Sequence, residues 1–146
     1  PLHGELRKYI ERNALSGVVE LAGAKPKDEI PEELARADAF LLCSKVAESG
    51  DKEGTPTVLV EAQAVGLPCV ATHHAGIPEM IPDSNHRFLA SEGDVEAVRD
   101  RIERLVTSSP DELRQVTRAG RDYVEKNFDV KEEAKKLIEV YEECAA

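Results

Sequence analysis

The sequence predicts an α/β domain with a mostly parallel sheet, and three observations support this. Short apolar segments alternate with amphipathic segments along the chain, which is typical of a parallel sheet covered on both faces by helices. The length of 146 residues suits one compact domain, and a hydrophobic content of 41% is enough to fill a core. We therefore expect residues 1–146 to form one doubly wound, Rossmann-like domain with three αβα layers.

Four apolar segments have the length of strands. The strands are expected at residues 18–23, 39–43, 69–72 and 87–90. Helices are expected at residues 4–15, in a short segment ending at Leu34, at 56–65 and 77–81, and in three C-terminal segments that begin after Asp94, Ser109 and Asp129. Gly66 and Pro68 end the 56–65 helix in the usual way.

The three C-terminal helices carry recognisable start signals. Asp94 and Ser109 are good side-chain caps, and Pro110 suits the first helical position after Ser109. The apolar stripe of the first of these helices comprises Val95, Val98, Ile102 and Leu105. In the last helix the residues expected to face inward are Ala134, Leu137, Ile138 and Tyr141.

Charge and cysteine content exclude several classes of protein. A net charge of -10 argues against binding to nucleic acid, which needs clustered Lys and Arg, and against binding to an anionic membrane by charge alone. Cys43 and Cys69 lie in apolar runs and are expected in the core. An odd number of cysteines without metal-binding spacing indicates reduced thiols in a cytoplasmic protein. No apolar run is long enough to cross a bilayer.

The segment from Glu53 to Glu61 combines features of a ligand site. Its helix is apolar nearly all round and is expected to be buried, with Glu61 and Gln63 as its only strongly polar interior residues. A buried carboxylate costs free energy unless a partner satisfies it. Thr55 is the expected N-cap and Pro56 the first helical residue. The free N–H groups of the helix start then face the carboxyl ends of the strands, where such sheets bind ligands.

Glu53 and Glu61 bracket this helix start. Glu61 lies about five residues into the helix, roughly 7–8 Å along its axis, and helical side chains lean towards the N-terminus. The amides between the two carboxylates suit a phosphate, and the carboxylates suit vicinal hydroxyls. Either glutamate alone could be an ordinary surface residue, but the whole arrangement favours a ligand site. The strand-end loops of interest are residues 24–28, 44–55 and 73–76.

These residues also carry a family resemblance. Glu53-x7-Glu61, within the run from Gly50 to Thr72, closely resembles the retaining glycosyltransferases of group 1, which have the GT-B fold. Supporting matches are Gly23-Ala24, Ala37 to Leu42, and Gly76-Ile77-Pro78-Glu79. The resemblance covers the whole chain and implies that it is part of the C-terminal, donor-binding domain of such an enzyme.

The resemblance also implies roles for single residues. Glu53, as the catalytic member of the pair, would contact hydroxyls of the donor sugar, and Glu61 would bind the ribose hydroxyls. The backbone amides that would touch the sugar and the diphosphate are those of Gly54, Thr55 and Thr57. The nucleotide base would meet the backbone of Ala24 and Lys25. Relatives often have Gly where this chain has Pro56, so one amide donor is absent here.

No metal and no cofactor are expected besides the nucleoside-diphosphate sugar itself. Adjacent residues such as His73 and His74 rarely ligate one ion together, and no third ligand is evident. A polar contact of either histidine near the diphosphate stays open. For residues 76–79 a structural turn is favoured over a ligand contact.

The resemblance further implies that parts are missing. The N-terminal half of a GT-B enzyme, which takes a glycan or lipid acceptor, is absent, and so are the first two strands of the second half. In the strand order 3-2-1-4-5-6 these two strands fall between residues 18–22 and 39–43. We expect the missing part to have been removed, to be disordered, or to be replaced by self-association through the exposed sheet edges.

Three functions follow. The leading hypothesis is the nucleotide-sugar binding half of a retaining glycosyltransferase that transfers a hexose or related sugar, inactive as a fragment. The alternatives are an epimerase or phosphorylase of the same architecture, and a stand-alone sugar-nucleotide binding module. The expected location is the cytoplasm, with a peripheral position at the inner face of the membrane left open for the full-length protein.

Overall fold

A computed structural model describes residues 2–145, which form two compact units, the first ending at Ile30 and the second beginning at Pro31. The three strands all belong to the second unit. None of the helices in residues 2–145 is long and apolar enough to span a membrane.

The first unit contains helix α1 (His3–Arg12) and a segment without regular structure. The strand expected at residues 18–23 is absent, so that prediction is wrong. Val18 and Val19 instead donate both backbone N–H groups to the carbonyl of Leu15, and the Val18 side chain is 80% exposed. A strand needs a neighbour to take up its N–H and C=O groups, and the sheet of the described residues contains no strand that pairs with this segment.

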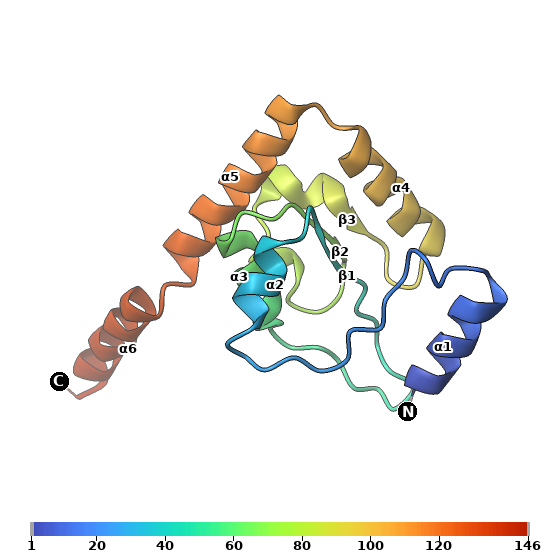
Figure 1. Ribbon diagram of the computed structural model, residues 1–146. Coiled ribbons are helices and arrows are strands. Elements are labelled where there is room, and N and C mark those ends of the chain that lie inside the picture. Colours follow the sequence, from blue (N-terminus) through green and yellow to red (C-terminus); the bar gives the residue numbers. More distant parts are fainter. Residues whose placement is uncertain (1, 146) are drawn as a thin grey trace. The chain divides into compact units, whose positions relative to one another are not determined.

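The second unit is built on a parallel sheet whose strands follow chain order (Figure 1). Strand β1 (Phe40–Leu42) pairs with β2 (Cys69–Thr72), and β2 pairs with β3 (Leu89–Ala90). The predicted α/β architecture with an open parallel sheet is therefore confirmed. The last strand is shorter than expected, because residues up to Phe88 belong to the 3-10 helix η2 (Asp83–Phe88).

Helices cover the middle of this sheet. Helix α3 (Thr57–Ala64) packs on β1 and β2, and helix α4 (Val95–Thr107) packs on β2 and β3. The two helices lie on either side of the strands in Figure 1. All four residues of β2 are buried, as expected of a strand whose two faces are both covered.

The core lies between the sheet and the C-terminal helices. Helix α5 (Pro110–Asn127) packs on α3 and η2. One buried cluster joins strand, 3-10 helix and both long helices, and its members are Val70, Phe88, Leu105 and Val116, with Leu113 packed against them.

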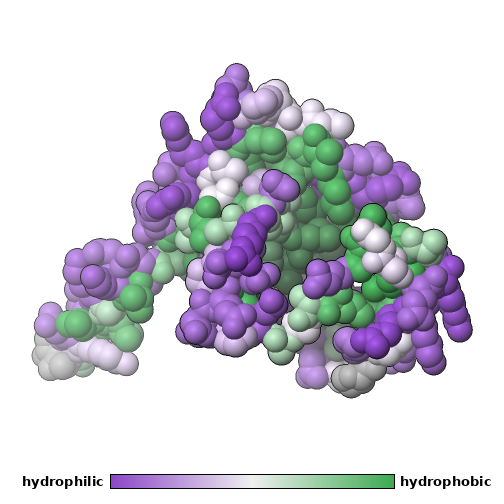
Figure 2. All heavy atoms as spheres, in the orientation of Figure 1, coloured by the Kyte–Doolittle hydropathy of each residue, from purple (hydrophilic) through white to green (hydrophobic). Residues whose placement is uncertain are grey.

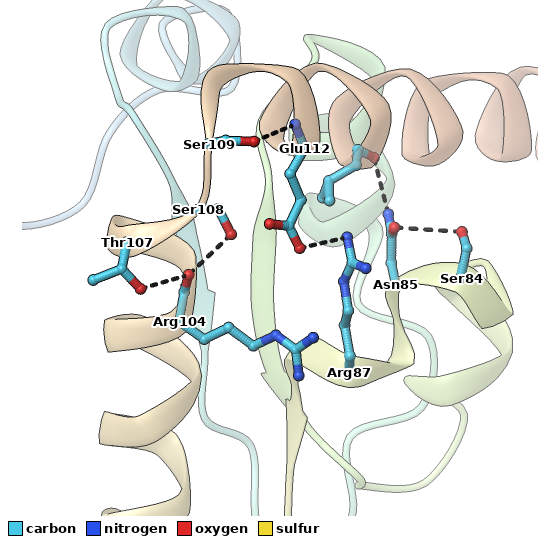
Figure 3. A network of polar contacts seen from close by, with 9 residues as sticks. Ser84, Asn85, Arg87, Arg104, Thr107, Ser108, Ser109 and Glu112 are labelled. Carbon is cyan, nitrogen blue, oxygen red and sulfur yellow. Dashed lines mark hydrogen bonds and ion pairs between the residues drawn. The ribbon is translucent and has the colours of Figure 1, made fainter.

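A polar network at the end of this core fixes η2 against α5 (Figure 3). Asn85 donates its side-chain N–H to the carbonyl of Val116 at 2.9 Å, and the guanidinium of Arg87 lies 3.2 Å from the carboxylate of Glu112. Because Asn85 is buried, its hydrogen bond removes the cost of burying an amide in this position.

The edge strand β1 is only partly covered. Leu41 is 48% exposed, and Cys43, which follows the strand, is exposed as well. The expectation that Cys43 lies in the core is therefore wrong, whereas the same expectation for Cys69 is confirmed. The reason is that β1 has a neighbour on one side only within residues 2–145. Self-association through this open edge stays a prediction.

The caps of the C-terminal helices are confirmed. Asp94 accepts a hydrogen bond from the backbone N–H of Ala97 at 2.9 Å, and Ser109 accepts one from that of Glu112 at 3.2 Å. Asp129 accepts from two backbone amides at the start of helix α6 (Val130–Ala145).

The apolar faces of these helices are less buried than expected. On α4, Leu105 is 5% exposed but Val95 is 78% exposed. On α6 the expected inward residues are exposed: Ala134, Leu137, Ile138 and Tyr141. This prediction is wrong because no other element of residues 2–145 covers the apolar side of α6, and Figure 2 shows hydrophobic residues uncovered on the lobe at lower left that α6 forms.

Candidate functional site

The candidate site lies at the carboxyl ends of β1 and β2, as expected. The loop of residues 44–55 leaves β1, and the loop of residues 73–76 leaves β2. The backbone N–H of Glu53 in the first loop donates to Nε2 of His74 in the second at 3.0 Å. Thr72, the last residue of β2, donates its hydroxyl to the carbonyl of Ser44 at 2.6 Å. The structure therefore brings two of the three predicted loops together.

The third predicted loop belongs to the first unit. Ala24 and Lys25 are exposed there, in a segment without helix or strand. The expected contact of their backbone with a base stays a prediction.

Helix α3 begins one residue later than expected. Pro56 is its N-cap, with an extended backbone (ψ 96°), and Thr55 makes no side-chain cap. The prediction of Thr55 as the cap is wrong because helical backbone angles start at Thr57. Gly66, with a φ of 84°, follows the helix end as predicted.

The start of α3 leaves backbone donors available. The carbonyl of Pro56 accepts the N–H of Leu59 at 2.9 Å. The amides of Thr57 and Val58 donate to no group of residues 2–145, as is normal in the first turn of a helix. Gly54, Thr55 and Thr57 are all exposed at this start. The helix start can therefore offer N–H groups to an anion.

The two glutamates occupy different environments. Glu53 is exposed on the loop, whereas Glu61 is half-buried on the second turn of α3. Within residues 2–145 neither carboxylate makes a hydrogen bond or an ion pair. Both are therefore free to accept hydrogen bonds from a ligand.

Gln63, the other polar residue of α3, has a structural role. It is 1% exposed, and its side-chain N–H donates to the carbonyls of Leu59 and Met80 at 3.2 and 2.8 Å. These bonds tie α3 to the 3-10 helix η1 (Pro78–Met80). Backbone hydrogen bonds from Ile77 to His74 and from Glu79 to Gly76 form a turn at residues 76–79, and the absence of a ligand contact there stays a prediction.

His74 and His73 differ sharply. His74 is 1% exposed and its Nδ1 lies 2.9 Å from a carboxylate oxygen of Glu92. His73 is exposed, and its ring meets that of His86 edge-on at 6.5 Å between centroids. Only His74 is therefore built into the site.

Glu92 is the residue that sequence reasoning missed. It lies in the loop after β3, one residue beyond Ser91, so the rule that ligands gather at strand ends was the signal that could have found it. Its other carboxylate oxygen accepts the backbone N–H of Val46 at 2.5 Å. The hydrogen bond from His74, followed by that from Val46, holds the pKa of Glu92 below its ordinary value. The ionised carboxylate thus connects the loops that follow all three strands.

A cavity of about 310 Å³ lies on the neighbouring side of the strand ends. Its lining comprises Cys43, Lys45, Thr72, Gly93, Asp94, Val95 and Val98. Neither Glu53 nor Glu61 lines it. This cavity is therefore separate from the two glutamates.

The described residues offer no metal site. Across residues 2–145 no three His, Cys, Asp or Glu side chains form a group that could hold a metal ion. Burial raises the pKa of Cys69 to about 12, so this thiol stays protonated. The absence of a metal and of a cofactor from the working protein stays a prediction.

An open parallel sheet with amide donors and two carboxylates beyond its strand ends defines a Rossmann-like ligand-binding domain. Residues 3–123 match the family described as "Glycosyl transferases group 1". The chain belongs to this family.

Two curated relatives are bacterial glycosyltransferases. The putative colanic acid biosynthesis glycosyltransferase WcaL of Escherichia coli is 40% identical over 129 residues, which are 88% of this chain and 32% of that protein. The amylovoran biosynthesis glycosyltransferase AmsK of Erwinia amylovora is 40% identical over 144 residues, which are 99% of this chain and 35% of that protein. The chain thus spans about a third of the length of these relatives.

Solved structures support the fold. HepE from Anabaena, in complex with UDP and glucose, has a TM-score of 0.80 and 22% identity, and the match covers 96% of this chain and 36% of that one. The C-terminal domain of LpcC, a glycosyl transferase group 1 family protein from Francisella tularensis, has a TM-score of 0.69 and 22% identity over 87% of this chain and 62% of that one. At this identity the likeness shows the fold, which is that of GT-B C-terminal domains.

Proposed function

We propose that this chain is the nucleotide-sugar binding part of a retaining glycosyltransferase, which transfers a hexose or related sugar from a nucleoside-diphosphate sugar to a glycan, lipid or other acceptor. The observation that carries the proposal is the start of α3. Two carboxylates without a partner in residues 2–145 stand around a helix N-terminus with unused amides, beyond the carboxyl ends of parallel strands.

Each part of this arrangement suits one part of the donor. The amides near Gly54, Thr55 and Thr57 would receive the sugar and the diphosphate, whose charge the helix start favours. Glu61 would accept hydrogen bonds from the ribose hydroxyls, and Glu53 from hydroxyls of the sugar. The complex of HepE with UDP and glucose supports a donor of this chemistry.

In the proposed reaction this domain positions the donor sugar and stabilises the charge of the departing diphosphate. Glu53 would hold the sugar so that its anomeric carbon stays aligned with the acceptor, and the helix amides would stabilise the departing diphosphate. Pro56 contributes no amide, so the other donors carry that task. The acceptor would be bound by the part of the full-length protein that this chain does not include.

The test compares two matched variants of the full-length protein by calorimetry with UDP, GDP and their sugars. Glu61→Gln should weaken the binding of the free nucleoside diphosphate by about tenfold or more, because it loses charge-assisted hydrogen bonds. Glu53→Gln should leave the free diphosphate nearly unchanged and weaken only the sugar-bearing donor. Glu96→Gln, on the exposed start of α4, is the control and should change neither.

The outcomes also separate the alternatives. Equal losses of affinity for both ligands in both variants would contradict the separate roles of Glu53 and Glu61. Donor binding without turnover, with every acceptor tried, would favour a stand-alone binding module. Interconversion of the free sugar nucleotide would favour an epimerase, and phosphorolysis of a glycan would favour a phosphorylase.

A further inference from the structure

We propose that His74 and Glu92 are positioning residues that hold the backbone of Glu53 ready for the donor sugar. This inference rests on the proposed function of Glu53. His74 comes from the loop after β2 and Glu92 from the loop after β3, whereas Glu53 lies on the loop after β1.

The geometry determines where the imidazole carries its hydrogen. The backbone N–H of Glu53 can only donate, and it lies 3.0 Å from Nε2 of His74. Nε2 must therefore be the unprotonated, accepting nitrogen. The hydrogen of a neutral imidazole is then on Nδ1, which donates to Glu92 at 2.9 Å. Glu92 thus selects the tautomer that can accept the amide of Glu53.

The same carboxylate holds the other end of the loop. Its second oxygen accepts the backbone N–H of Val46 at 2.5 Å. Glu92 therefore fixes Val46 directly and Glu53 through His74, which closes the loop of residues 46–53 onto the sheet.

The burial of His74 makes this anchor rigid. Its side chain is 1% exposed, so no bulk water competes for Nε2. The side chain of Glu53 stays exposed and without a partner in residues 2–145. A fixed backbone under a free carboxylate lowers the entropy cost of ordering the loop when a ligand binds.

Glu61 needs no such anchor, so the proposal predicts different effects on ligands that contact Glu53 and on ligands that contact only Glu61. It stands inside α3, where its own carbonyl accepts the N–H of Val65 at 3.1 Å as part of the helix. Loss of the His74 anchor should therefore affect ligands that reach Glu53 and spare those that reach only Glu61.

The test is a pair of substitutions at His74 in the full-length protein. His74→Gln can place an amide oxygen near the position of Nε2 and keep an acceptor for the Glu53 amide. His74→Asn is too short for that, but can still donate to Glu92 from the position of Nδ1. The two side chains are similar in polarity, but Gln also fills more of the space of His74, which is buried. Thermal unfolding of both variants therefore has to separate the lost hydrogen bond from lost packing.

We expect His74→Asn to raise the KM for the sugar donor by about fivefold, the effect of one hydrogen bond. Its kcat at saturating donor should stay within about twofold of the wild type, and so should the affinity for the free nucleoside diphosphate. His74→Gln should restore most of the affinity for the sugar donor. Glu92→Ala should weaken the sugar donor at least as much as His74→Asn, because it also releases the backbone N–H of Val46. Adding Glu92→Ala to His74→Gln should cost only the part that comes from Val46, because His74→Gln has already lost the contact with Glu92.

Three results would decide against the proposal. Equal losses in His74→Asn and His74→Gln would overturn it, and so would a loss of free diphosphate binding as large as that of the sugar donor. No loss in His74→Asn, when Glu53→Gln does weaken the sugar donor, would also overturn it and would leave the proposed function standing. If Glu53→Gln itself has no effect on the sugar donor, the proposed function fails first. Thermal unfolding of each variant, with Glu92→Ala as the second route to the same anchor, separates a folding defect from a binding one.

Discussion

Strands β1 and β2 are both short and mostly apolar, but they have different surroundings. Both are short apolar segments, Phe40–Leu42 and Cys69–Thr72. Every residue of β2 is buried, whereas Leu41 in the middle of β1 is 48% exposed. The difference arises because β2 has a strand on each side and helices on both faces, while β1 is the edge of the described sheet. The apolar pattern therefore indicates the strand, and the neighbours decide whether it is buried.

The largest effect on stability is expected in the buried cluster around Phe88. Phe88 is 1% exposed and packs with Val70, Leu105 and Val116. Phe88→Ala should lower the free energy of unfolding by about 3–5 kcal/mol, because it removes a buried ring and leaves a cavity. Equilibrium urea denaturation of the chain measures this. A loss below about 1 kcal/mol would mean that this cluster is not the core.

A direct comparison of the two strands comes next. Val70→Ala in β2 should cost about 2 kcal/mol and Leu41→Ala in β1 less than about 1 kcal/mol, although the second removes more carbon atoms. The same urea measurement on the full-length protein should raise the cost at Leu41, because we expect preceding strands to cover β1 there. An unchanged cost at Leu41 would contradict that expectation.

A smaller effect on stability is expected where helices α3 and α5 approach each other closely. A Cβ added at Gly120 of α5 would lie 3.2 Å from the side-chain oxygen of Gln63 on α3. Gly120→Ala should therefore destabilise the chain by about 1–2 kcal/mol, even though alanine is the better helix former. Gly120→Ala combined with Gln63→Ala should recover part of the loss in thermal unfolding. Stabilisation by Gly120→Ala alone would show that the Gln63 side chain can shift enough to admit the added methyl group.

The smallest effect on stability is expected from Glu92, which ties the loop after β3 to His74 in the loop after β2 and to Val46 in the loop after β1. The pKa of Glu92 is lowered in the folded chain, chiefly by its hydrogen bond with His74. The stabilisation is therefore present above the ordinary glutamate pKa of about 4.3, and it is lost as the pH falls through the lower value of the folded state. The difference in urea midpoint between the wild type and Glu92→Gln should be present at about pH 6 and should shrink towards about pH 3. A difference that is independent of pH would contradict this linkage.

Much of the fold could be predicted because it depends on local chemistry. The caps Asp94 and Ser109 and the glycine at the end of α3 all act through hydrogen bonds and backbone angles within a few residues. The strand expected at residues 18–23 failed for a different reason. Its apolar residues fit a strand, but strand formation depends on a partner that no described residue supplies.

In the candidate site, too, the local features could be predicted and the distant contacts could not. Glu53, Glu61 and the start of α3 could be found because they are close in sequence and share one helix. Glu92 lies far along the chain from Glu53, and only the parallel packing of β1, β2 and β3 brings it to His74. The burial of α6 could not be predicted either, since an amphipathic pattern does not specify which surface will cover it.

The hydrogen bond between the Glu53 amide and His74 has a spectroscopic consequence. An amide on an exposed loop would exchange its hydrogen with water quickly, but this one points at a buried imidazole nitrogen. Its exchange requires the loop to leave the sheet, so the rate of that single amide measures how often the loop opens. Hydrogen exchange at the Glu53 amide, followed by 15N NMR, therefore reports how often this loop opens. The measurement needs no ligand.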